Sequence, residues 1–150
     1  MNWKQETIDR LEKMEPMRQA MRSIPMELRR LDAEAENLRR SECSQTKVLT
    51  HSKWEDRMLD NYVRRQELQW SYENTKRWLE VTQRALARLS KEQQMILKRL
   101  YVQPTAGAME QLTEELGVER STVYRWRDKA LETFTLCMYG DGLPLRGCCQ

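Results

Sequence analysis

The stretch from Trp54 to Leu89 contains neither Gly nor Pro, and it constrains the fold more than any other part of the chain. At about 1.5 Å per residue, a helix over this range would extend about 50 Å. Its apolar positions recur at steps of four and three residues, the pattern of one buried helix face. These positions are Leu68, Tyr72, Thr75, Leu79, Thr82, Leu86 and Leu89. We predict one long helix, with Trp70, Trp78 and Val81 widening the apolar face.

A second apolar face lies nearer the N-terminus and shows the same alternation of steps. Its members are Leu11, Met14, Met17, Met21, Ile24, Leu28, Leu31, Ala35 and Leu38. Pro16 and Pro25 interrupt the run, because proline lacks an N–H and disfavours helix in the residue before it. We therefore predict a short helix up to about Arg22 and a second from Pro25 to Arg40. The Ser- and Thr-rich residues 41–53 are expected to form a loop.

Two long helices joined by a loop bury their apolar faces most simply as an antiparallel, coiled-coil-like hairpin. The hairpin could close within one chain or against a second copy. We assign residues 1–89 to this hairpin, with a role in oligomerisation or partner binding. Because its apolar area exceeds what one two-helix hairpin readily covers, we expect a homodimer.

The composition indicates an all-α chain and offers no enzyme site. Hydrophobic residues make up 39% and charged residues 33%, and five Gly and four Pro are few for 150 residues. One His, and four Cys without a CxxC pair, predict reduced thiols and no metal site. The sequence has no Gly-rich phosphate loop and no isolated carboxylate cluster, so we expect no catalytic residue and no cofactor. Without a signal peptide or an apolar run near the roughly 20 residues that cross a bilayer, a cytoplasmic protein with no membrane contact is expected.

The chain changes character at Ser90, where Gln93 follows at the spacing of a capping box and predicts the start of a helix. Pro104 and Gly107 are expected to end that helix. These signals place the start of a C-terminal domain at residue 90.

A pair of helices is predicted next, the first from about Ala108 to Leu116 and the second running to about Met138. Gly117 lies between them, where glycine can take the left-handed conformation of a tight turn. Residues 90–139 are thus expected to form a helix-turn-helix domain, and residues 140–150 a flexible tail.

The second helix of this pair, over about residues 120–137, has side chains suited to the major groove of DNA. We expect Val123 and Trp126 to be buried against the first helix. The outward side chains are then Arg120, Ser121, Thr122, Tyr124, Arg125 and Lys129. Hydroxyls and N-terminal backbone N–H groups contact phosphates, Arg reads guanine edges, and Tyr contacts a phosphate or a thymine methyl group.

The charge of this domain is balanced but segregated. Residues 90–139 contain seven Lys or Arg and seven Asp or Glu, and the whole chain carries a formal charge of +3. Acids gather on the first helix of the pair, and the second carries Arg120, Arg125, Arg127 and Lys129. Because few phosphates can be neutralised, we expect modest and salt-dependent affinity for double-stranded DNA.

The segments "LSKEQQMILKRLY" and "MEQLTEELGVERSTVYRWRDKALETF" resemble region 4 of bacterial sigma factors. They are more similar still to phage and prophage late-gene activators of the ArpU/RinA type. The resemblance implies a transcription regulator whose second helix enters the major groove through Arg120, Ser121, Thr122, Tyr124 and Arg125, and which can contact RNA polymerase.

Two other functions fit the same pattern. Small terminase subunits, which recognise DNA for packaging, also join a helix-turn-helix to helical oligomerisation segments. A helical scaffold that has lost DNA binding is the third alternative. A ring of many subunits would favour packaging, whereas a monomer or dimer would favour regulation.

Overall fold

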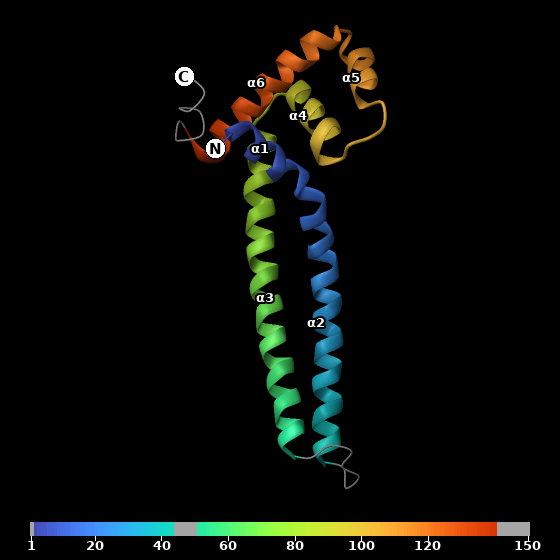
Figure 1. Ribbon diagram of the computed structural model, residues 1–150, viewed down its shortest axis with the longest axis vertical. Coiled ribbons are helices and arrows are strands. Elements are labelled where there is room, and N and C mark those ends of the chain that lie inside the picture. Colours follow the sequence, from blue (N-terminus) through green and yellow to red (C-terminus); the bar gives the residue numbers. More distant parts are fainter. Residues whose placement is uncertain (1, 44–50, 141–150) are drawn as a thin grey trace. The chain divides into compact units, whose positions relative to one another are not determined.

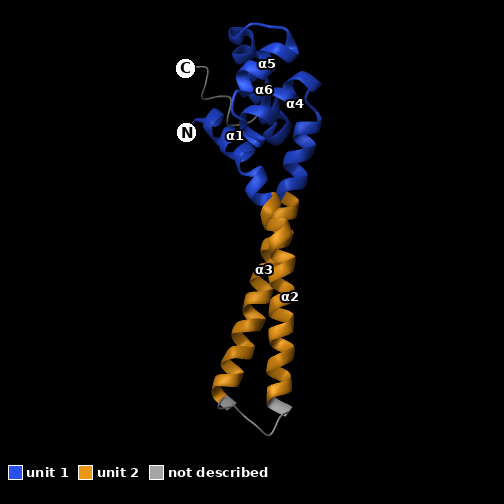
Figure 2. Ribbon diagram, turned by 90° about the vertical axis from the view of Figure 1, so that its right-hand side faces the viewer, with its two compact units in different colours: residues 1–17, 78–150 blue, residues 18–77 orange. Residues whose placement is uncertain are grey.

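The structure, a computed structural model, describes residues 2–43 and 51–140, and within these ranges it contains helices and connecting turns but no β-strand (Figure 1). The prediction of an all-α chain is confirmed. The predicted tail, residues 140–150, lies outside the described residues beyond Gly140. The chain divides into two compact units, which are residues 18–77 (unit 2) and residues 1–17 with 78–150 (unit 1) (Figure 2).

Unit 2 is a helical hairpin within one chain, built from most of α2 (Met14–Cys43) and α3 (His51–Ala87). The two helices lie side by side in both views (Figures 1 and 2). Their contact buries Leu31 and Leu38 of α2. Two side chains of α3 donate to carbonyl oxygens of α2: Asn61 Nδ2 to Leu31 O at 2.8 Å and Trp54 Nε1 to Leu38 O at 2.6 Å. These bonds fix which residues of the two helices face each other.

The prolines do not divide α2 as the sequence suggested. α1 (Trp3–Glu12) ends before Lys13, and α2 then runs without a break past both Pro16 and Pro25. Pro16 lies in the first turn, where a backbone N–H has no partner within the helix. Pro25 removes one internal hydrogen bond, but its neighbour Ile24 is buried and packing holds the helix together.

The prediction of a loop over residues 41–53 is wrong at both of its ends, where the structure has helix. α2 continues to Cys43, and α3 begins at His51. The remainder of the prediction, residues 44–50, lies outside the described residues.

Unit 1 packs α1 and the last turns of α3 against α4 (Lys91–Leu97), the π-helical segment η1 (Lys98–Val102), α5 (Ala108–Leu116) and α6 (Arg120–Tyr139). Its main buried cluster comprises Trp3, Leu11, Met14, Ala85, Leu86, Leu89, Leu97, Val102, Ala130, Leu131 and Phe134. The buried hydroxyls of Thr7 and Thr135 lie 2.8 Å apart in a hydrogen bond between α1 and α6. The chain's first helix thus completes the core around α6, so the boundaries of unit 1 differ from the predicted division at residue 90.

The predicted helix start at Ser90 is confirmed. The Ser90 hydroxyl accepts from the Gln93 backbone N–H, and the Gln93 side chain accepts from the Ser90 backbone N–H, both at 3.2 Å. The helix that follows changes to the wider π-helical turn at Lys98, whose carbonyl oxygen accepts from the N–H of Gln103 at 2.8 Å. Periodicity alone does not reveal this change.

Candidate nucleic-acid interface

A three-residue turn joins α5 to α6, and a glycine shapes it. Gly117 has a φ of 65°, in the left-handed region where a residue with a Cβ atom is strained. The N–H groups of Gly117 and Val118 both donate to the Thr113 carbonyl oxygen, at 3.0 and 3.3 Å, and so close the end of α5. The predicted bounds of the first helix and the position of the turn agree with the structure.

A second buried cluster sets the rotation of α6 about its axis. Ile96 of α4, Leu112 of α5 and Val123 of α6 are all fully buried in this cluster. Further along α6, Ala130 and Phe134 enter the main core at the spacing of one helix face. The opposite face of α6 is therefore turned to solvent.

Ser121, Arg125 and Lys129 follow one another at four-residue intervals and form an exposed stripe on that opposite face, which we call the α6 stripe. Their outward position agrees with the sequence prediction. Arg125 Nη2 donates to Thr122 Oγ1 at 3.3 Å, and Lys129 Nζ lies 3.5 Å from Glu132 Oε2. These contacts are on the surface, where water and other partners compete with them, so both cations remain accessible to a ligand.

Three other predicted site residues lie beside the α6 stripe. Thr122 is half-buried rather than outward. Arg120 is exposed, and its Nη2 lies 2.9 Å from Glu110 Oε1 of α5. Tyr124 is exposed, with the Arg127 guanidinium 5.0 Å from the centre of its ring. The structure therefore places three of the six predicted residues on the α6 stripe and three on its borders.

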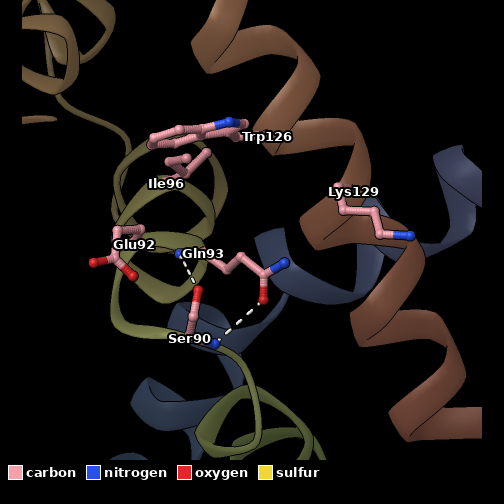
Figure 3. Close-up of a pocket in the computed structure, with 6 residues that line it drawn as sticks. All are labelled: Ser90, Glu92, Gln93, Ile96, Trp126 and Lys129. Atoms are coloured by element: carbon pink, nitrogen blue, oxygen red, sulfur yellow. Dashed lines mark hydrogen bonds between the residues drawn. The ribbon is translucent and has the colours of Figure 1, made fainter. Parts of the chain in front are cut away.

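The prediction that Trp126 is buried is wrong, because the residue is 37% exposed. Its indole lies over Ile96 at the edge of a pocket of about 350 Å³, which Ser90, Glu92, Gln93 and Lys129 also line (Figure 3). The adjacent Arg127 lies on the inward side instead and is only partly exposed. Trp126 and Arg127 are respectively three and four residues after the buried Val123, and both spacings suit a helix face.

Arg127 and Asp128 form a network that the sequence did not reveal. Arg127 Nη2 donates to Asp128 Oδ1 at 2.9 Å, and Lys4 Nζ of α1 lies 3.2 Å from the same oxygen. Burial favours a higher pKa for the Asp128 carboxyl, but the hydrogen bonds from Arg127 and Lys4 outweigh it and lower that pKa. Burial raises the pKa of the nearby Tyr101 hydroxyl, against the opposing effect of Arg127.

Lys4 brings a further cation to the α6 stripe. It lines one shallow pocket together with Trp3, Arg125, Asp128, Lys129 and Glu132. Lys4, Arg125 and Lys129 thus surround a common hollow, although Lys4 belongs to the first helix of the chain. No sequence pattern joins residues so far apart, since only the packing of α1 on α6 brings them together.

Two of the acids on α5 are paired with cations of unit 1. Glu110 lies against Arg120, and Glu115 Oε1 is 2.7 Å from Arg99 Nη1. The negative charge of α5 is thereby partly neutralised within the chain. The positive charge of the α6 stripe can therefore attract an anionic ligand. The range of this attraction shortens as the salt concentration rises.

Comparisons of the chain with family models, with curated proteins and with solved structures found no significant match. Among residues 2–43 and 51–140, no group of His, Cys, Asp and Glu side chains could hold a metal ion. Within the same ranges, every helix is too short or too polar to span a bilayer.

Proposed function

We propose that the chain is a sequence-specific DNA-binding transcription regulator in which α5 and α6 form a helix-turn-helix unit and α6 is the recognition helix. One observation carries the proposal. The exposed face of the second helix after a tight glycine turn presents a hydroxyl and two cations at one-turn spacing. That arrangement fits the major groove, which admits one α-helix and exposes hydrogen-bonding base edges.

The residues have distinct roles in this proposal. Arg125, near the middle of the α6 stripe, is the side chain expected to read a guanine edge. Ser121 and the free backbone N–H groups at the start of α6 contact a phosphate. Lys129 and Lys4 contact the backbone on either side and supply affinity without base preference.

The regulatory role is proposed from the resemblance to sigma region 4 and to phage late-gene activators. In that setting the DNA site lies near a promoter, and another surface of the chain contacts RNA polymerase. The DNA-binding step is the one that the described contacts support, and it can be tested without knowledge of the promoter.

The test begins with selection of bound sequences from random duplex DNA, followed by titration of the best site with matched variants. Arg125→Ala should weaken binding to that site by about 1 to 3 kcal/mol and relax its preference at one base pair. Lys129→Ala should weaken binding to all sequences alike. As a control, Arg40→Ala removes an exposed cation from α2 and should leave affinity unchanged.

Two outcomes would contradict the proposal. One is the absence of any enriched sequence at low salt, where electrostatic binding is strongest. The other is equal loss of affinity in Arg125→Ala and Arg40→Ala, which would show that net charge rather than the α6 stripe determines binding. Circular dichroism of each variant verifies that the helices are retained.

A further inference from the structure

The hairpin carries a second regular face that packing within the chain does not use. On the inner face of α3, Trp54 and Asn61 contact α2. On the outer face, four residues recur at intervals of seven, and an exposed leucine lies between the first two of them. This set, which we call the α3 stripe, consists of Asp56, Leu59, Val63, Trp70 and Arg77.

Three members of the α3 stripe are apolar and exposed. Trp70 is 73% exposed, Leu59 61% and Val63 44%, and Tyr62 beside them is also exposed. Trp70 was expected to widen the inner apolar face, but it points the other way. Apolar residues gathered this closely on one exposed helix face are typical of an interface, and repeats of seven are typical of one helix packing along another.

The ends of the α3 stripe carry opposite charges. Asp56 lies at one end and Arg77 at the other, and within the described residues neither takes part in an ion pair. The acid and the base are three heptads apart, so they are too distant to pair with each other along the helix.

The charges of two α3 stripes are complementary only when the two helices run antiparallel. If a second α3 lies antiparallel on the stripe, Asp56 of each copy faces Arg77 of the other, and Val63 faces Trp70. If it lies parallel, Asp56 faces Asp56 and Arg77 faces Arg77, which is repulsive. A two-fold axis near Gln66 generates the antiparallel arrangement and places each contact twice in the interface.

We propose that a second copy of this chain docks on the α3 stripe, antiparallel to the first, and forms a symmetric dimer through the outer faces of the two hairpins. Each Trp70 packs beside Val63 of the partner copy, once on either side of the two-fold axis. At each end of the interface, Asp56 of one copy pairs with Arg77 of the other. These pairs favour the antiparallel direction of the two helices. This inference does not depend on DNA binding, because all of its residues lie in unit 2.

Sedimentation equilibrium of the full chain at micromolar concentration tests the dimer. The wild-type chain should sediment at twice its mass of 18.1 kDa. Trp70→Glu should raise the dissociation constant of the dimer about a hundredfold, because it places a charge against Val63 of the partner copy. Met26→Glu is the matched control, since Met26 is 68% exposed on α2 and lies outside the α3 stripe.

A charge-exchange cycle tests the direction. Asp56→Lys and Arg77→Asp should each weaken the dimer about tenfold, because each places like charges opposite one another. The double variant should return to the wild-type dissociation constant. In a parallel dimer neither single exchange would weaken association, so that result would overturn the proposed geometry.

Three other results would overturn the proposal. They are a wild-type mass of one chain, a dimer that Trp70→Glu leaves intact, and equal weakening by Trp70→Glu and Met26→Glu. Helicity is measured for every variant. If Trp70→Glu loses helicity, the charge-exchange cycle decides alone, because all of its substitutions are at exposed positions.

Discussion

Lys4 Nζ lies 3.2 Å from Asp128 Oδ1, and this contact joins the first helix of the chain to the helix proposed to read DNA. Both side chains are partly exposed, so the pair adds little to stability by itself. Its effect is positional, because it keeps a cation beside Arg125 and Lys129.

Lys4→Ala should therefore weaken DNA binding without changing which sequence is preferred. Loss of one phosphate contact should make the slope of log affinity against log salt shallower by about 1. Titrations of the selected duplex at several salt concentrations measure the slope. Lys91→Ala, which removes an exposed cation from α4, is the control, and an identical slope in Lys4→Ala and the wild type would remove Lys4 from the interface.

Core packing in unit 1 should depend on Phe134 and much less on Trp126. Phe134 is fully buried, so Phe134→Ala should lower the free energy of unfolding by about 3 to 5 kcal/mol. Trp126→Ala should cost less, about 1 to 3 kcal/mol, because Trp126 is already 37% exposed. Urea unfolding followed by circular dichroism compares the two, and equal losses would mean that α6 is rotated from the position described.

Substitutions of Gly117, in the turn between α5 and α6, should destabilise the fold through backbone strain and not through a steric clash of the new side chain. A Cβ atom at Gly117 would meet no atom within 4 Å, but its φ of 65° strains any residue with a side chain. Gly117→Ala should therefore cost about 1 kcal/mol. Gly117→Asn should cost less, since asparagine tolerates this conformation, and thermal unfolding that ranks the two variants the other way would refute this account.

Asp128 should contribute to the acid sensitivity of the fold. Its pKa is lowered in the folded chain, so the stabilisation is present above the ordinary pKa of about 3.9 and is lost as the pH falls through the lowered value. Asp128→Asn should remove this part of the pH dependence. The difference in unfolding free energy between wild type and variant should therefore shrink as the pH falls below about 4. A difference that stays constant with pH would show that the carboxylate gains nothing from Lys4 and Arg127.

The parts of the fold that sequence analysis predicted well depend on neighbours within a few residues. The capping box at Ser90 and the turn at Gly117 are local signals, because the bonding groups are three to five residues apart. The break expected at Pro25 did not occur, since packing of Ile24 outweighs one missing hydrogen bond. The burial of Ile24 depends on tertiary packing, which a local rule does not consider.

In the candidate site, too, local patterns predicted some features, whereas others depend on tertiary packing. The exposure of Ser121, Arg125 and Lys129 follows from helical periodicity. Periodicity does not choose between Trp126 and Arg127 as the inward residue, because both are spaced suitably from Val123. The choice depends on Asp128 and Tyr101, which give the Arg127 guanidinium partners in a partly buried place. Lys4 was missed because only tertiary packing brings it to α6.

The Thr7–Thr135 contact has a consequence for how the protein is made. α1 is synthesised before α6, yet Leu11 and Met14 share a buried cluster with Ala130, Leu131 and Phe134 of α6. Contacts between residues so distant in sequence form late and slow the folding of a domain. A nascent chain that stalls before α6 would hold the apolar side of its first helix in water, open to chaperones and proteases. The surface proposed to read DNA, which includes Lys4, would thus form only after α6 has been synthesised and has packed on α1.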